Sequence, residues 1–213
     1  MPVNTQKFAE ISKELIAKNT TLVAVSKTKP VEDIQALYDL GQRDFGENYV
    51  QELVDKQLLL PKDIHWHFIG HLQSNKVKMI APFVELIQGV DSVKLLTEIN
   101  KQAAKYNRII NCLLQVHIAQ EETKFGMNEA ELVEAKEKAN SLPNVKICGL
   151  MGMASFSEDT ALVRKEFRYL HSLVEKYSFQ GILSMGMSGD YEMAIEEGSN
   201  MVRIGSLLFG SRG

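Results

Sequence analysis

The sequence has little cysteine and no long apolar stretch. Only two cysteines, Cys112 and Cys148, occur among 213 residues, and neither has a partner at the spacing of a metal site or a redox pair. No apolar run approaches the length that crosses a bilayer, and residues 1–15 lack a basic start followed by an apolar segment. The sequence therefore predicts no disulfide framework, no membrane span and no secretory signal, and we expect a cytoplasmic protein.

An excess of one charge is also missing. The chain has 24 Lys plus Arg against 27 Asp plus Glu, which gives a formal net charge of −3. Proteins that bind nucleic acid or membrane surfaces through charge carry a strongly basic balance. The composition therefore predicts no nucleic-acid partner and no membrane partner, and it favours a protein that handles a small molecule. Hydrophobic residues make up 45% of the chain, enough for the core of one large domain.

Short apolar or β-branched runs alternate with amphipathic stretches along almost the whole chain. The runs predict strands at Leu22–Ser26, Asp44–Gly46, Ile64–Ile69, Val84–Gln88, Ile109–Ile118, Val145–Gly149, Gly181–Met185 and Met201–Ile204. The amphipathic stretches predict helices at Val31–Leu40, Tyr49–Leu58, Ser92–Tyr106, Asn128–Ser141, Thr160–Tyr177 and Tyr191–Glu197. Such alternation is typical of a parallel sheet covered by helices.

This pattern predicts the fold. Eight strands in 213 residues match a single-domain α/β protein, a (β/α)8 TIM-type barrel over residues 1–213. Thr5–Lys18 is predicted as an extra N-terminal helix that could close the barrel floor. The second strand is the weakest, because Arg43, Asp44 and Gly46 are poor strand formers. A doubly wound open sheet is therefore the alternative fold.

Lys27 follows the first predicted strand, where a barrel would place its active face. A lysine in a partly desolvated barrel mouth has a lowered pKa, so its neutral amine can attack an aldehyde. Lys27 is therefore a candidate for a Schiff base. A strand-end lysine is more often a solvated loop charge, and strand parity does not decide whether Lys27 or Lys29 points inward.

The loops after the last two predicted strands are rich in glycine and hydroxyl groups. Residues 186–190 (GMSGD) and Gly205-Ser206 offer small side chains and backbone N–H groups where barrels commonly bind phosphate. Either loop alone could be only a tight turn, but together they favour an anion site. Arg203, inside the last predicted strand, needs either a buried carboxylate partner or a cofactor ring nitrogen to bind.

Three histidines close together raise the question of a metal site. His65 and His67 share one face of a strand, and His71 follows. No further cluster at a strand end supplies the remaining ligands. Packing or hydrogen bonding is therefore the favoured interpretation, and no metal site is predicted.

Seven motifs, in order along the chain, resemble those of the pyridoxal phosphate homeostasis (YggS/PROSC) family. They are LVAVSKTKP at 22–30, FGENYVQE at 45–52, WHFIGHLQSNK at 66–76, TKFGM at 123–127, GLMGMAS at 149–155, SMGMSGDYEMAI at 184–195 and VRIGSLLFGSR at 202–212. The resemblance covers essentially the whole chain. It implies that the chain forms a barrel related to the N-terminal domain of alanine racemase and that this barrel binds pyridoxal 5'-phosphate.

The resemblance also implies roles for individual residues. Lys27 would carry the cofactor as an internal aldimine. Ser188, Gly205 and Ser206 would hold the phosphate. The remaining members of the implied site are Arg203 facing the pyridine nitrogen, Asn48 close to the ring, and His67 and Met187 as further pocket residues.

Catalytic turnover is not expected. The cofactor ring is a good electron sink when its nitrogen is protonated, which an arginine such as Arg203 opposes. Alanine racemase uses a tyrosine acid/base supplied by a second domain and an opposing subunit, and the sequence leaves no room for that domain after the last strand. We therefore expect a monomer that acts in vitamin B6 homeostasis, with indirect effects on amino-acid metabolism.

Two enzymatic alternatives remain open. The first is a small pyridoxal-phosphate-dependent amino-acid racemase that uses Lys27 and a residue such as His67 as its two bases. The second is a cofactor-free barrel enzyme whose lysine forms a Schiff base with a sugar phosphate. The seven motifs make the second the least favoured.

Overall fold

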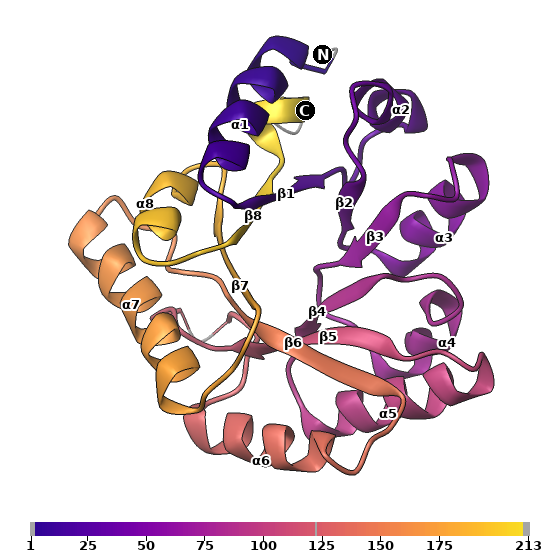
Figure 1. Ribbon diagram of the computed structural model, residues 1–213, viewed down its shortest axis with the longest axis vertical. Coiled ribbons are helices and arrows are strands. Elements are labelled where there is room, and N and C mark those ends of the chain that lie inside the picture. The colour runs from indigo at the N-terminus through magenta and orange to yellow at the C-terminus, as the bar shows by residue number, and fades with distance from the viewer. Residues whose placement is uncertain (1–2, 122, 211–213) are drawn as a thin grey trace.

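The computed structural model describes residues 3–121 and 123–210. Its centre is a closed barrel of eight parallel strands, each paired with its neighbours in chain order and with β8 paired to β1 (Figure 1). The strands are β1 (Thr21–Val25), β2 (Asp44–Glu47), β3 (His65–Phe68), β4 (Leu86–Val90), β5 (Ile110–Val116), β6 (Val145–Gly152), β7 (Ile182–Met187) and β8 (Met201–Ile204). The predicted TIM-type barrel is confirmed, and the open sheet is excluded by the pairing of β8 with β1.

The weak second strand forms despite its composition. Phe45 points outward and is fully buried under the helices. At position 46, an added Cβ would lie 3.0 Å from the Val23 side chain and 3.1 Å from that of Ile69, so glycine fits where a larger residue would crowd its neighbours. The packing around β2 therefore outweighs its low strand propensity.

Helices surround the barrel. The predicted ones are α1 (Thr5–Ala17), α2 (Val31–Asp39), α3 (Val50–Leu59), α5 (Val93–Lys105), α6 (Glu129–Ala139), α7 (Thr160–Lys176) and α8 (Tyr191–Glu196). Three further short helices were not predicted: η1 (Ser74–Lys76), α4 (Val77–Ile80) and α9 (Ser206–Phe209). Each has at most four residues, too few for an amphipathic period to show in the sequence. None of the described helices is long and apolar enough to cross a membrane.

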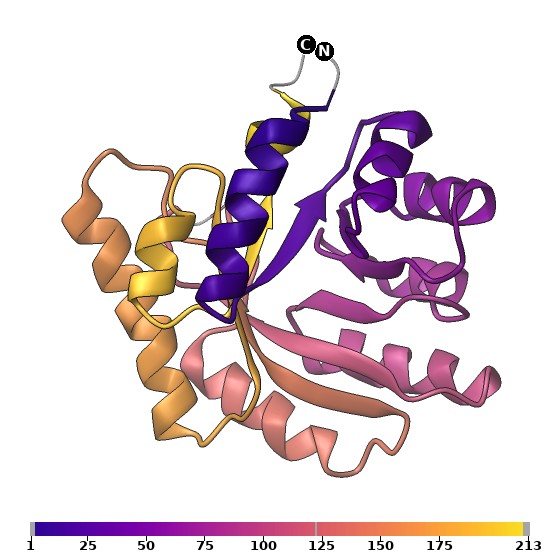
Figure 2. The same ribbon diagram turned by 45° about the horizontal axis from the view of Figure 1, so that its top comes forward.

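The N-terminal helix occupies a different place from the one expected. α1 runs along the outside of the barrel, beside β1 and next to α9 (Figures 1 and 2). The Asn4 N–H donates to the Leu208 carbonyl at 2.8 Å, and Phe8, Ile11 and Leu15 are buried on one face of α1. The expected closure of the barrel floor is therefore wrong, because this apolar face packs into the outer ring of helices.

The barrel interior is partly apolar and partly polar. A small cluster within the barrel consists of Val23, Leu86, Leu113, Met151 and Met201. The larger core lies between the strands and the helices. Four polar side chains inside the barrel, those of His67, Gln88, Ser184 and Arg203, are also buried, and each is hydrogen-bonded.

Candidate functional site

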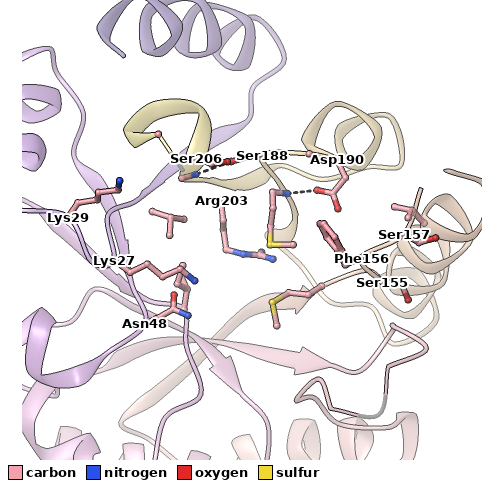
Figure 3. Close-up of a pocket in the computed structure, with 18 residues that line it drawn as sticks. Lys27, Lys29, Asn48, Ser155, Phe156, Ser157, Ser188, Asp190, Arg203 and Ser206 are labelled. Atoms are coloured by element: carbon pink, nitrogen blue, oxygen red, sulfur yellow. Dashed lines mark hydrogen bonds between the residues drawn. The ribbon is translucent and has the colours of Figure 1, made fainter. Parts of the chain in front are cut away.

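A cavity of about 530 Å³ opens at the carboxyl ends of the strands (Figure 3). Its size is that of a typical small-molecule site. Its lining combines polar groups with apolar walls: Val25, Lys27, Lys29, Asn48, Ile69, Met153, Ser155, Phe156, Ser157, Val163, Met187, Ser188, Gly189, Asp190, Arg203, Gly205, Ser206 and Gly210. Seven of the eight residues predicted for the site are in this lining; His67 is not.

Lys27 lies in the loop directly after β1 and lines the cavity. Figure 3 shows its side chain beside Asn48, at one side of the drawn residues, with Arg203 in the middle. Lys29 also lines the cavity, but its Nζ donates to the Phe209 carbonyl at 2.7 Å. The structure therefore brings both lysines of the loop to the cavity and fixes Lys29 on α9.

Asn48 follows β2 and contributes a buried acceptor. Its Oδ1 has no hydrogen-bond partner among the described residues, although solvent does not reach it. A buried amide oxygen of this kind costs free energy unless a ligand or water binds it. The orphaned acceptor fits a cavity built to hold a polar ligand beside Lys27.

Arg203 extends from β8 into the barrel, and the residue is 4% exposed. Its guanidinium donates to the Ser184 hydroxyl at 2.6 Å and to the Gly152 carbonyl at 3.1 Å. Burial lowers the pKa of Arg203 to about 10, which still leaves it a cation at neutral pH. Both hydrogen-bond acceptors found for the guanidinium are neutral, so the carboxylate partner considered from the sequence is not among them.

The loops after β7 and β8 meet at one corner of the cavity. Gly205 N–H donates to the Ser188 hydroxyl oxygen at 3.1 Å, and Ser206 begins α9 beside them (Figure 3). Met187 N–H donates to the Asp190 carboxylate at 2.6 Å, which fixes the shape of the first loop. Burial raises the pKa of Asp190. The two hydroxyls and the small residues make this corner suitable for an anion.

His67 lies below the cavity rather than in its wall. It is 2% exposed, with Nε2 3.0 Å from the Asp44 carboxylate and Nδ1 2.9 Å from the Gln88 amide nitrogen. The Ser184 hydroxyl donates to Gln88 Oε1 at 2.7 Å and accepts from Arg203. A hydrogen-bonded chain therefore joins His67 to the cavity through Arg203.

Several residues of the cavity wall were not predicted from the sequence. Phe156 and Ser157, in the loop after β6, line the cavity, and Phe156 is fully exposed. Ser155 is fixed by Glu166, which accepts from its N–H and its hydroxyl. The only signal for them was the general rule that loops after barrel strands form the site.

The histidines do not form a metal site in the part of the chain that is described. His65 and His67 both approach Asp44, at 3.4 Å and 3.0 Å, while His71 pairs with Asp91. No group of three or more potential ligands is found among the described residues. The ring nitrogens of His67 and His71 instead lie within hydrogen-bonding distance of these carboxylates, the role that the sequence favoured.

Comparison with known proteins places the chain in a family. The family model described as alanine racemase, N-terminal domain, matches residues 4–213. A pyridoxal phosphate homeostasis protein of Pasteurella multocida is 42% identical over 201 residues, covering 90% of this chain and 86% of that protein. A protein of the same name from Homo sapiens is 40% identical over 225 residues, covering 97% and 82%.

A solved structure is also similar to this chain. PipY of Synechococcus elongatus, with pyridoxal phosphate bound, is similar with a TM-score of 0.87 at 33% identity, over 96% of this chain and 99% of that chain. The predicted relationship to the alanine racemase N-terminal domain is confirmed by the family model. The chain therefore belongs to the alanine racemase N-terminal domain family and, within it, to the pyridoxal phosphate homeostasis proteins.

Proposed function

We propose that this chain binds pyridoxal 5'-phosphate in the cavity, covalently through Lys27, and takes part in vitamin B6 homeostasis without catalytic turnover of its own. The observation that carries the proposal is the meeting of Lys27, Asn48 and Arg203 with two serine-bearing loops in one cavity. The relatives' name and the cofactor-bound PipY structure support it.

Each residue has a task in this proposal. The bound cofactor supplies an aldehyde that condenses with a primary amine. The Lys27 Nζ lone pair bonds to the aldehyde carbon, and both amine hydrogens leave with the carbonyl oxygen as water. Ser188 and Ser206 donate hydroxyl hydrogen bonds to the phosphate. The orphaned Asn48 Oδ1 accepts a hydrogen bond within the cavity.

Arg203 supports the absence of turnover. A buried cation next to the ring nitrogen disfavours protonation of that nitrogen, and the unprotonated ring withdraws electrons weakly. Among the described lining residues there is no histidine or tyrosine to serve as a second acid or base. His67, the second base of the racemase alternative, is held by Asp44 and Gln88 below the cavity.

Absorption spectroscopy tests the proposal directly. We expect purified protein incubated with pyridoxal phosphate to be yellow and, after borohydride reduction, to carry the cofactor mass on the peptide that contains Lys27. Lys27→Ala removes the label, whereas Lys29→Ala, which changes the neighbouring lysine of the same loop, retains it. A wild-type protein that takes up no cofactor refutes the proposal.

Hydrogen exchange separates the homeostasis role from the racemase alternative. The loaded protein is incubated with a panel of amino acids in deuterated water. We expect no Lys27-dependent deuterium incorporation at the α-carbon above the rate given by free pyridoxal phosphate. Rapid incorporation that Lys27→Ala abolishes identifies a racemase instead.

We also propose that the chain acts as one domain, as a monomer, in the cytoplasm. The composition and the continuous alternation of strands and helices support this. Light scattering on the purified protein measures the mass in solution, and a mass of twice 24.0 kDa contradicts the monomer.

A further inference from the structure

The loop that carries Lys27 is a strained turn. Lys29 N–H donates to the Ser26 carbonyl at 3.0 Å, which makes residues 26–29 a β-turn with Lys27 second and Thr28 third. Thr28 has φ of +63°, a left-handed conformation that turns normally assign to glycine or asparagine at this position. For a β-branched residue it is an outlier that persists only when its surroundings impose it.

A buried ionic cluster lies behind this turn. Lys56 of α3 approaches Glu47 Oε1 at 2.8 Å and Glu52 Oε1 at 2.6 Å. The side chain of Lys56 is 7% exposed, that of Glu47 is fully buried, and that of Glu52 is 22% exposed. Glu47 ends β2, and Glu52 lies one turn before Lys56 on α3. We call these three residues the ionic cluster.

The ionic cluster holds the turn on both sides of Lys27. Before Lys27, the Ser26 hydroxyl donates to Glu47 at 2.6 Å and the Ser26 carbonyl accepts from Lys56 Nζ at 2.8 Å. After it, the Thr28 N–H donates to Glu52 at 2.6 Å. The backbone that positions Lys27 is thus fixed by charge-assisted hydrogen bonds, which are stronger than those between neutral groups.

Stability alone does not explain such a cluster. Burial raises the pKa of Glu47, and the Lys56 ammonium opposes that rise, so desolvation of the charges already costs free energy. Well-packed apolar residues often stabilise a protein as much as a buried ion pair does, or more. Three charged groups bound to the two neighbours of one lysine instead indicate a geometric role.

We propose that Glu47, Glu52 and Lys56 are positioning residues that hold the strained turn and keep the Lys27 amine directed into the cavity. The inference rests on the proposed function, because covalent binding of the cofactor is the reason why Lys27 must be held in place. It assigns a role to the two glutamates of the FGENYVQE motif, which touch the turn but do not line the cavity.

The first test needs no cofactor. Hydrogen–deuterium exchange of the apo protein measures the opening of the Thr28 N–H. We expect Glu52→Ala to speed its exchange about tenfold, as loss of a hydrogen bond to a charged group predicts. Glu52→Gln, which keeps one acceptor oxygen at this position but removes the charge, retains most of the protection. Exchange as slow in Glu52→Ala as in the wild type overturns the proposal.

The second test measures attachment. The rate constant for covalent uptake of pyridoxal phosphate on Lys27, trapped with borohydride, is expected to fall about tenfold in Glu52→Ala and by less than about threefold in Glu52→Gln. In a Thr28→Gly background the effect of Glu52→Ala shrinks, because glycine adopts positive φ without strain. An attachment rate unchanged in Glu52→Ala overturns the proposal.

A matched variant controls for general loss of stability. Glu129→Ala removes a helix glutamate that accepts from Lys176 and Tyr177 away from the cavity, and we expect it to leave the attachment rate unchanged. If Glu129→Ala slows attachment as much as Glu52→Ala does, the effect is general and the proposal fails. If the wild type itself takes up no cofactor, the proposed function fails, and the exchange experiment alone decides whether the ionic cluster holds the turn.

Discussion

Replacing Gln88 by leucine tests the polar chain inside the barrel. Gln88 is fully buried, its Oε1 accepts from the Ser184 hydroxyl, and its Nε2 lies 2.9 Å from His67 Nδ1. With His67 Nδ1 as acceptor, its Nε2 carries the proton and donates to Asp44. Gln88→Leu nearly conserves volume, but it leaves one buried donor and one buried acceptor without their partner.

The cost follows from these two groups. A buried polar group that loses its partner costs about 1–3 kcal/mol, so two groups cost about 2–6 kcal/mol. Leucine recovers part of this by its apolar contacts with the cluster around Leu86 and Met201. We expect a net loss of about 3 kcal/mol, which lowers Tm by about 6–12 °C for a chain of this length.

Urea and thermal unfolding of the apo protein, followed by circular dichroism, measure this loss. Gln102→Leu is the matched control, because Gln102 is 5% exposed and its Oε1 is buried with no partner among the described residues. Its one hydrogen bond found here runs to Glu98 along α5. We expect Gln102→Leu to stay within about 1 kcal/mol of the wild type. Equal losses in the two variants, or a loss below about 1 kcal/mol in Gln88→Leu, refute the reasoning.

Three further predictions concern the backbone, acid stability and the phosphate corner. Gly149→Ala unfolds the barrel at β6 or costs more than about 4 kcal/mol in urea titration, because Gly149 has φ of +143° and a Cβ would overlap the Ile182 carbonyl. Backbone N–H groups, the Phe156 N–H foremost, lower the pKa of Glu121 to about 2. The stabilisation that these hydrogen bonds give the fold is therefore fully present above the unfolded-state pKa near 4.5, and it is lost as pH falls towards 2. Urea unfolding midpoints measured between about pH 2 and 4.5 should change less with pH in Glu121→Gln than in the wild type. The same pH dependence in both proteins would show that Glu121 is not its source. Ser206→Ala weakens equilibrium binding of pyridoxal phosphate about tenfold but not that of pyridoxal, and an equal loss for both ligands excludes a phosphate contact.

The fold was largely readable from the sequence because its signal is periodic. Strands such as β1 and β5 are short apolar runs between turn residues, and α7 repeats its apolar residues at helical spacing. Short helices carry no such period, so α4 and α9 were missed. The position of α1 depends on contacts with α9 at the other end of the chain, which no local pattern contains.

The candidate site likewise has residues that the sequence could predict and contacts that it could not. Lys27 and Ser188 could be found because each follows a strand whose end lies at the barrel mouth. His67 shares the inward direction of its strand but lies too deep to reach the cavity wall. The contact of Lys56 with Ser26 joins residues 30 positions apart, so only the folded chain shows it.

The packing of α1 against α9 has a consequence for synthesis on the ribosome. α1 is the first described helix to be translated, and its contact with Leu208 requires one of the last described elements. Until then the apolar face formed by Phe8, Ile11 and Leu15 lacks part of its packing surface. Contacts between such distant segments form late and slow folding. During synthesis the apolar face of α1 is therefore prone to aggregate until α9 has been made, and the helix that carries Ser206 gains its final support only when that face docks.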